Sequence, residues 1–240
     1  MPLSAMSLKA VLFDFNGVIL DDEPLHKQLI EEILINENLR PRAGEFEQFC
    51  LGRSDRAGLK DLLTQRGRWL TETHLDRLIA TKTAAYQQYL KQLETLPLFE
   101  GLQPLLEQLQ KAEIKMAVVT GAQRSEVMKI LERTQLSAYF SVLVTAEDCQ
   151  ASKPEPEGYL LAVQLLAEKF PQLQLTPLNC LAIEDSFAGI EAAKRAGIPV
   201  LGVAHTYPFH MLQRRANWTV DYLQDLELDR LIQTYGGSPA

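Results

Sequence analysis

The sequence has 240 residues and a mass of 27.0 kDa, and its 46% hydrophobic and 23% charged residues are typical of a globular protein. Its net charge of -7 at pH 7 argues against nucleic acid or an anionic membrane surface as the main partner. The start of the sequence has no secretory pattern, and no window approaches about 18 uninterrupted apolar residues, so we expect a cytoplasmic protein without membrane contact.

Five short apolar runs predict buried β-strands along the chain. In chain order they are "AVLF" at 10–13, "IKMAVV" at 114–119, "SVLV" at 141–144, "CLAI" at 180–183 and "IPVLGVA" at 198–204. Segments with helical periodicity lie between the later runs, at 101–112, 123–135, 157–169 and 187–196. Because strands alternate with helices, the sequence predicts an α/β fold whose parallel sheet is covered on both faces.

Residues 22–95 interrupt this alternation, because they hold helical patterns but no convincing strand. They predict a small helical lobe inserted after the first strand. We therefore predict two domains, an α/β core formed by residues 1–21 and 96–240 and a helical domain formed by residues 22–95. Three aromatic residues at helical spacing are expected to pack inside the helical domain: Trp69, Tyr86 and Tyr89.

Polar residues gather where the predicted strands end, which is where open parallel sheets bind ligands. Asp14 follows the first strand, Thr120 and Gly121 follow the second, Glu184 and Asp185 follow the fourth, and Lys153 lies after the third. Taken singly, each has a structural explanation, such as a helix cap or a solvated charge. Together they predict a phosphate site with a carboxylate nucleophile, acids for a cation, a hydroxyl group and an ammonium group.

Asp14 is the candidate nucleophile of this site. Acidic oxygen ligands with no accompanying His or Cys favour Mg²⁺ over zinc. The Thr120 hydroxyl and the Lys153 ammonium group would hold the phosphate oxygens for in-line attack by Asp14. The expected product of that attack is a covalent aspartyl phosphate.

Four motifs follow one another in a fixed order. They are "DFNGVILDDEPLH", "VVTG", "SKPEPEGY" and "IEDSFAGIEAAKRAGIPVLGV", with "ANWTVDYLQDL" near the end. With these motifs the chain resembles the haloacid dehalogenase superfamily, specifically its phosphatase and β-phosphoglucomutase-like branch. The resemblance covers essentially the whole chain, and it implies a Rossmann-like core, an inserted helical cap and Mg²⁺ as cofactor.

The resemblance also implies roles for individual residues. It implies that Asp14 is the nucleophile and a metal ligand, that Thr120, Gly121 and Lys153 hold the phosphate, and that Glu184 and Asp185 bind the metal. At position 16 the family usually has Asp, whose backbone carbonyl binds the metal and whose carboxyl group is the general acid and base. This sequence has Asn16, which keeps the carbonyl but loses a proton donor that typically contributes about 10² to 10⁴-fold.

Two positions in the predicted cap are candidates for substrate contact. His26 matches a position that the family often fills with His near the cap entrance, and we interpret it as orienting the loop rather than transferring protons. The segment "LGRSDRAGLKDLL" resembles the family's substrate-specificity loop, in which Arg53 is a candidate cation. In sugar phosphomutases the Ser of this loop is followed by Arg, whereas Ser54 is followed by Asp55, which argues against a mutase.

Three functions therefore stay open. The leading one is a Mg²⁺-dependent phosphoric monoester hydrolase that acts on a small phosphorylated metabolite through Asp14 and is slowed by Asn16. The second is a sugar phosphomutase, which needs a cap cation for a distal phosphate. The third is a phosphate-binding or regulatory protein that keeps the metal and phosphate sites but does not turn over. We expect a monomer or a homodimer with no nucleic-acid partner.

Overall fold

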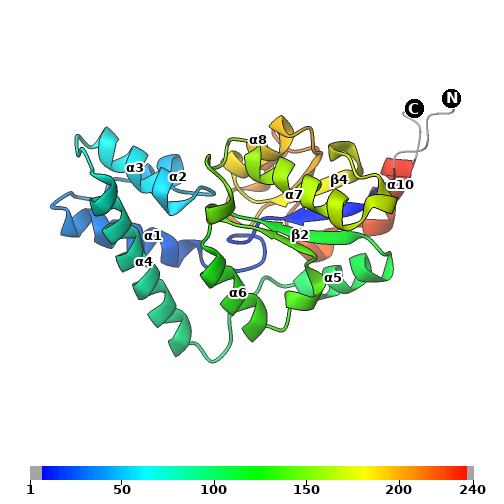
Figure 1. The fold of residues 1–240 in the computed structure, drawn as a ribbon, viewed down its shortest axis with the longest axis horizontal. Helices are drawn as coiled ribbons and strands as arrows, with labels where there is room; N and C mark the ends of the chain where they lie inside the picture. The colour runs from blue at the N-terminus through cyan, green and yellow to red at the C-terminus, as the bar shows by residue number, and fades with distance from the viewer. Residues whose placement is uncertain (1–6, 237–240) are drawn as a thin grey trace.

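The centre of the molecule is a six-stranded sheet in the order β3-β2-β1-β4-β5-β6, with all strands parallel (Figure 1). The computed structural model describes residues 7–236. The strands are β1 Ala10–Phe13, β2 Lys115–Val119, β3 Val142–Val144, β4 Cys180–Glu184, β5 Val200–Val203 and β6 Trp218–Val220. The predicted Rossmann-like parallel sheet is confirmed. The sixth strand, β6, lies in the "ANWTV" segment rather than in an apolar run.

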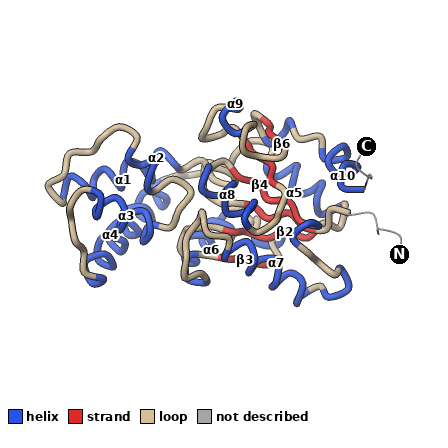
Figure 2. Tube along the Cα trace, turned by 90° about the horizontal axis from the view of Figure 1, so that it is seen from above, coloured by secondary structure: helices blue, strands red, loops and turns tan. Residues whose placement is uncertain are grey.

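Helices cover both faces of the sheet, which Figure 2 shows from above. The helices on one face are α5 Leu102–Lys111, α6 Arg124–Arg133 and α10 Leu228–Gly236. Those on the other face are α7 Glu157–Lys169, α8 Phe187–Arg195 and α9 Phe209–Leu212. Within β1, Val11 and Phe13 face the first group, and Ala10 and Leu12 face the second. Both faces are buried, and this is why the strands have continuous apolar sequences.

Four further helices lie together beyond one end of the sheet, at the left of Figure 1. They are α1 Glu23–Asn36, α2 Glu45–Phe49, α3 Asp55–Gln65 and α4 Glu72–Gln92. Their apolar side chains form a third cluster, separate from the two clusters beside the sheet. All four helices lie within residues 22–95, while the exact boundaries of the cap domain stay a prediction.

The three aromatic residues expected inside the cap are placed differently. Tyr86 is buried, but in the apolar cluster that joins α4 to the sheet. Trp69 is 90% exposed, because it lies in the loop before α4, where helical spacing does not apply. Tyr89 is 45% exposed, because the buried face of α4 runs through Lys82, Tyr86 and Leu90. The packing prediction was wrong for Trp69 and Tyr89.

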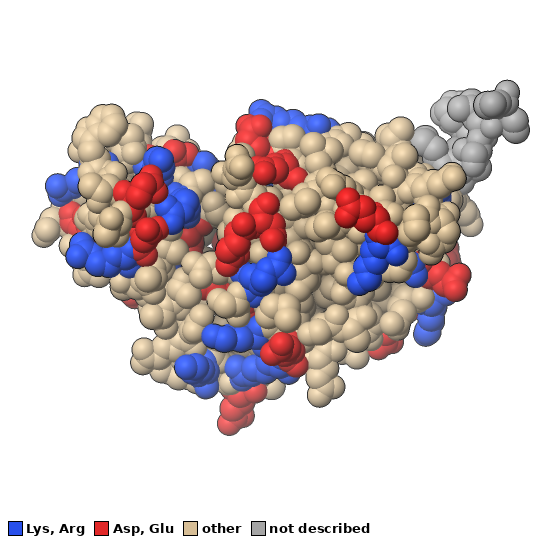
Figure 3. Space-filling view, viewed as in Figure 1, with Lys and Arg blue, Asp and Glu red and all other residues tan. Residues whose placement is uncertain are grey.

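Charged side chains of both signs are mixed over the face that Figure 3 shows. Many of the surface charges pair locally, as Arg195 does with Glu155 and Glu191. Within residues 7–236, no helix is long and apolar enough to cross a membrane. The cytoplasmic localisation stays a prediction.

Candidate active site

The pairing of the central strands brings three carboxylates together. β1 pairs with β4 so that Phe13 lies beside Ile183, and the next residues, Asp14 and Glu184, meet at the carboxyl edge of the sheet. Asp14, Glu184 and Asp185 are at most 4% exposed, and each offers an oxygen within 4.8 Å of the others. A buried acidic centre therefore lies where parallel sheets bind ligands.

Lys153 lies between two of these carboxylates. Its Nζ atom is 2.8 Å from Asp14 Oδ1 and donates to Glu184 Oε1 at 2.7 Å. Burial lowers the pKa of Lys153, but the charges of Asp14 and Glu184 outweigh burial and raise the pKa above its ordinary value. The ammonium group therefore stays protonated at neutral pH.

One ammonium group does not neutralise three buried carboxylates. Burial, followed by the charge of Glu184, raises the pKa of Asp14 well above its ordinary value. The same two causes raise the pKa of Asp185 to about 7. A cation beside these carboxylates would stabilise their ionised forms.

The residues present fit a hard divalent cation. The Oδ1 atom of Asp185 is buried and has no hydrogen-bond partner within the described chain. The loop after β1 approaches closely, since a Cβ atom on Gly17 would lie only 2.0 Å from Asp185 Oδ2. Carboxylate and carbonyl oxygens are the ligands that Mg²⁺ prefers. Asp14, Asp185 and the backbone carbonyl of Asn16 are the groups that would hold the ion.

Glu184 differs from Asp185 because both of its oxygens already accept hydrogen bonds. Oε1 accepts from Lys153 and, at 2.5 Å, from the Tyr159 hydroxyl, and Oε2 accepts from Ser186 at 3.3 Å. A Cβ atom on Gly189 would lie 1.9 Å from Glu184 Oε2, so only glycine lets α8 begin here. Glu184 therefore orients Lys153, and it would have to give up a donor to bind an ion directly.

Thr120 and Gly121 line a cavity of about 40 Å³ together with Asp14 and Asn16. Thr120 is 6% exposed, and its Oγ1 atom accepts from the backbone N–H of Ala122 at 3.0 Å. Because a hydroxyl can donate and accept at once, the hydrogen of Thr120 is left to donate to a ligand. This cavity has space for a group of the size of a phosphate.

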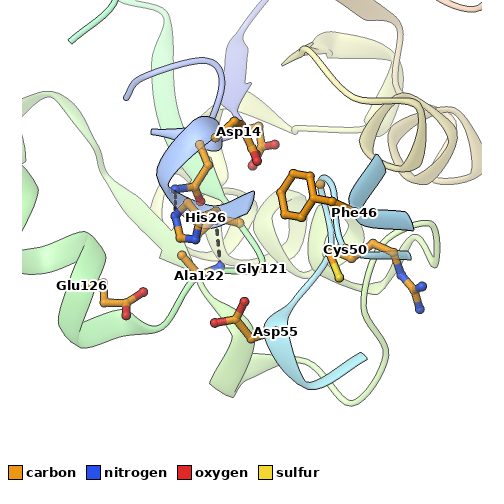
Figure 4. A pocket seen from close by; sticks show the side chains of 13 residues that line it. Asp14, His26, Phe46, Cys50, Asp55, Gly121, Ala122 and Glu126 are labelled. Atoms are coloured by element: carbon orange, nitrogen blue, oxygen red, sulfur yellow. Dashed lines mark hydrogen bonds between the residues drawn. The ribbon is translucent and has the colours of Figure 1, made fainter. Parts of the chain in front are cut away.

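The cap closes the cavity from the opposite side, where Figure 4 shows Phe46 and Asp55 across from Gly121. The backbone of the cap loop comes close to the core here. The backbone N–H of Ser54 donates to Ser152 Oγ at 2.8 Å, and a Cβ atom on Gly121 would lie 2.7 Å from Ser54 N. In this arrangement the cap loop covers part of the cavity and narrows its opening to solvent.

We expect Gly121→Ala to lower kcat/KM by about 10²-fold, because its Cβ atom would push the cap loop away from the core. Steady-state kinetics with an aryl phosphate measures this. The control is Gly44→Ala, which has open space but a φ of 83°, so it should lower Tm without changing kcat/KM. Unchanged kinetics in Gly121→Ala would contradict the closed arrangement.

Asn16 donates from Nδ2 to both carboxylate oxygens of Asp22, at 3.0 and 2.9 Å. Asp22 is 2% exposed and also accepts from the Tyr86 hydroxyl. Burial alone would raise the pKa of Asp22, but His26, Tyr86 and Asn16 together bring it below its ordinary value. Sequence reasoning did not connect Asp22 with Tyr86, because the two residues are 64 positions apart and no local pattern links them.

His26 continues this hydrogen-bonded group towards the cap. Its Nε2 atom lies 3.1 Å from Asn16 Nδ2 and 3.2 Å from Asp22 Oδ2, and its Nδ1 atom lies 2.7 Å from Lys82 Nζ. Lys82, 3% exposed, pairs with Asp55 at 2.8 Å. His26 therefore lies in a chain of contacts from the core loop to α4.

Arg53 lines the same cavity, but its guanidinium group is already engaged. Its Nη2 atom donates to Asp61 at 2.7 Å, Nη1 to the Phe49 carbonyl at 2.9 Å, and Nε to the Lys153 carbonyl at 3.3 Å. The side chain thus ties the cap loop to the loop after β3. A substrate contact by Arg53 would require it to exchange one of these partners.

A second cavity, of about 300 Å³, borders the first, and Glu23 and Phe46 line both. Its wall includes Phe99, His205 and Tyr207. The rings of Phe99 and His205 stack with their centroids 3.7 Å apart. A pocket with aromatic walls and a few polar groups is typical of small-molecule sites. It has room for a part of a ligand that the smaller cavity cannot contain.

Comparison with known proteins identifies relatives of this chain. A family model described as haloacid dehalogenase-like hydrolase matches residues 11–203. The phosphorylated carbohydrates phosphatase of Thermotoga maritima is 29% identical over 201 residues, 83% of this chain and 87% of the relative. The β-phosphoglucomutase of Bacillus subtilis is 30% identical over 230 residues, 93% of this chain and 94% of the relative.

The solved structures agree with these relatives at the level of the fold. The crystal structure of β-phosphoglucomutase from Clostridium difficile has a TM-score of 0.82 and 23% identity, and it covers 95% of this chain and 97% of its own. The family model alone spans well over half of the sequence. The chain therefore belongs to the haloacid dehalogenase-like hydrolases, in their branch of phosphatases and β-phosphoglucomutases.

Proposed function

We propose that the protein is a Mg²⁺-dependent phosphatase that acts on a small phosphorylated metabolite through an aspartyl phosphate on Asp14. The observation that carries this proposal is that Asp14, 2.8 Å from Lys153 Nζ, lines a cavity between core and cap together with Thr120 and Gly121. That set supplies a nucleophile, a fixed cation and a hydroxyl donor. The names of the relatives support a phosphorylated carbohydrate as the substrate class.

In the proposed reaction, an Asp14 oxygen attacks phosphorus in line with the leaving oxygen, and water then hydrolyses the aspartyl phosphate. Lys153 favours the ionised form of Asp14 and orients its carboxylate, while the Thr120 hydroxyl donates to a phosphate oxygen. The cap loop around Ser54 narrows the opening of the cavity to solvent. When bound, Mg²⁺ would neutralise the charges of the phosphate and of the carboxylate that attacks it.

Asn16 limits the leaving groups that this site can accept. An amide cannot give a proton to the departing oxygen, and the missing general acid typically accounts for about 10² to 10⁴-fold in rate. The loss falls mainly on alkyl phosphates, whose leaving group is a poor anion. Acyl and aryl phosphates, whose leaving groups depart as stable anions, are therefore expected to be hydrolysed faster than alkyl phosphates of sugars.

A sugar phosphomutase is the second candidate, because one relative is a β-phosphoglucomutase. This reaction needs a cation for the distal phosphate of a bisphosphate. Among the described residues, the Lys and Arg side chains that line the two cavities are Arg53 and Lys27. Arg53 pairs with Asp61 and Lys27 pairs with Glu47, so neither is free for a second phosphate. The phosphatase is therefore the better supported function.

A panel of phosphate monoesters tests the proposal. We expect Mg²⁺-dependent hydrolysis, with kcat/KM for an aryl or acyl phosphate at least about 10²-fold above that for a hexose phosphate. EDTA should abolish turnover. Isomerisation of a hexose 1-phosphate would favour the mutase instead. If Mg²⁺ and phosphate bind but no ester is hydrolysed, the protein is a binding or regulatory protein.

Mg²⁺ should stabilise the folded protein independently of activity. At about 100 times its Kd, we expect Mg²⁺ to raise Tm by about 5 to 10 °C relative to a NaCl control of equal ionic strength. In Asp185→Asn the metal-free Tm should rise, because one repelled carboxylate is removed, and most of the Mg²⁺ effect should disappear. A wild-type Tm that does not respond to Mg²⁺ would argue against a metal site here.

A further inference from the structure

Asp22 is a buried carboxylate that accepts hydrogen bonds from three side chains. Both of its oxygens accept from Asn16 Nδ2, and Oδ2 also accepts from the Tyr86 hydroxyl. His26 Nε2 lies 3.2 Å from the same Oδ2 atom. Asp22 is only 2% exposed, so these groups replace water as its hydrogen-bond donors.

The tautomer of His26 follows from Lys82. An ammonium group has three donors and no acceptor, so Nδ1 of His26, 2.7 Å from Lys82 Nζ, must accept. The proton of a neutral His26 ring is then on Nε2, which donates to Asp22. Nε2 cannot also accept from Asn16. A hydrogen of the Asn16 amide is therefore directed to Asp22 and shared between its two oxygens.

This fixes which end of the Asn16 side chain faces the cavity. The reversed amide would place its oxygen 3.0 and 2.9 Å from two carboxylate oxygens, which would repel it, and the Nε2–H group of His26 is already directed to Asp22. With Nδ2 held by Asp22, the amide oxygen is the end left for the cavity that Asn16 lines beside Asp14. That oxygen can accept a hydrogen bond from water or from a hydroxyl group, but it cannot donate a proton.

The restraint comes from two helices of the cap. Asp22 and His26 lie at the start of α1, whereas Lys82 and Tyr86 lie one turn apart on α4. Lys82 is held in turn by Asp55 at 2.8 Å. The orientation of a core side chain is therefore set by a helix of the cap.

We propose that Asp22 is a positioning residue matched to Asn16, which it holds with the amide oxygen towards the cavity to orient the water that attacks the aspartyl phosphate. This inference rests on the proposed phosphatase function and deepens it. Amide and carboxylate form a pair, so restoring a carboxylate at position 16 alone breaks the pair. In Asn16→Asp two carboxylates would meet at the 2.9 Å contact, and Asp22 would lose the donor that both of its oxygens use.

The test is a cycle of four proteins: wild type, Asn16→Asp, Asp22→Asn and the double variant. The double variant exchanges carboxylate and amide, so their hydrogen bond can form in the opposite direction. On a hexose phosphate we expect Asn16→Asp to change kcat by less than about threefold, and the double variant to exceed it by at least about 30-fold. The preference for aryl over alkyl phosphate should shrink in the double variant, because the carboxyl group that it carries at position 16 can donate a proton.

Tm gives a second readout that does not need turnover. Each single variant should lower Tm by about 5 °C, and the double variant should recover most of that loss. Glu45→Gln is the structural control, because it breaks the buried pair with Arg66 elsewhere in the cap and should lower Tm without changing the aryl-to-alkyl ratio.

Each outcome decides between the two proposals. If Asn16→Asp alone reaches the activity of the double variant, or if the Tm changes simply add, the pairing of Asp22 with Asn16 is overturned. If no variant hydrolyses any ester while the Tm changes are strongly coupled, the phosphatase function is overturned and the structural pair survives, without the role in orienting water.

Discussion

Replacing Asp14 by Asn is expected to reduce kcat by at least about 10⁴-fold with every phosphate ester, because it removes the proposed nucleophile. The amide has nearly the same shape, so the loss would not come from packing. Steady-state and single-turnover kinetics with an aryl phosphate measure it. Turnover that survives Asp14→Asn would show that another group attacks phosphorus.

The same substitution should stabilise the metal-free protein. Burial and the charge of Glu184 raise the pKa of Asp14 even though Lys153 lies 2.8 Å away, so its ionised form is unfavourable in the fold. A neutral amide removes this penalty, and Tm without Mg²⁺ should rise by a few degrees. Glu72→Gln, on the exposed face of the cap, is the control that should change neither kcat nor Tm. A lower Tm in Asp14→Asn would mean that its pair with Lys153 outweighs the repulsion.

Lys153→Met should give the largest loss of stability. It removes the cation that Asp14 and Glu184 share, and breaking a buried ion pair in this way costs about 3 to 5 kcal/mol. For a chain of this length we expect Tm to fall by about 6 to 20 °C. Activity should be lost as well, because nothing then holds Asp14 and a phosphate oxygen. Thermal unfolding with and without Mg²⁺ measures the effect, and Mg²⁺ should recover part of it.

Lys27→Met is the matched control for Lys153→Met. Lys27 forms its ion pair with Glu47 at 2.7 Å, but both side chains are more than one third exposed. Exposed pairs contribute no more than about 1 kcal/mol, so Tm should change by less than about 4 °C. Equal losses in the two variants would show that burial does not determine the contribution of Lys153.

The sheet and its acidic edge were predictable because both depend on local sequence. Continuous apolar runs such as "CLAI" mark strands buried on both faces, and the residues that follow them must lie at one edge of a parallel sheet. That is why Asp14, Glu184 and Asp185 were expected together. β6 was expected only from the resemblance of "ANWTVDYLQDL" to the family's final strand, because it is short and its three residues are only partly buried.

The surroundings of Asn16 were not predictable in the same way. Asp22 and His26 belong to the motif that contains Asn16, but Lys82 and Tyr86 reach them from α4, more than 50 residues later. Helical periodicity indicates only that Lys82 lies on the same face as Tyr86. It does not indicate that this face turns towards the core loop, which depends on how the cap packs.

Arg53 is a second case in which the sequence did not reveal the partners of a side chain. A cation in a substrate-specificity loop is a reasonable candidate for substrate contact, and the sequence contains no sign of competing partners. In the folded chain, two backbone carbonyls and Asp61 accept from it. Carbonyl acceptors are present at every residue, so sequence patterns cannot reveal such a competition.

The contact between the cap loop and the core determines which substitutions this loop can accept. The loop meets Gly121 through the backbone of Arg53 and Ser54, and Ser152 binds the backbone N–H of Ser54. On the side of the cap loop, this contact uses a backbone N–H group, which every residue except proline has. The side chain at position 54 can therefore vary without loss of this backbone contact, whereas the Arg53 side chain adds a further tie through the Lys153 carbonyl.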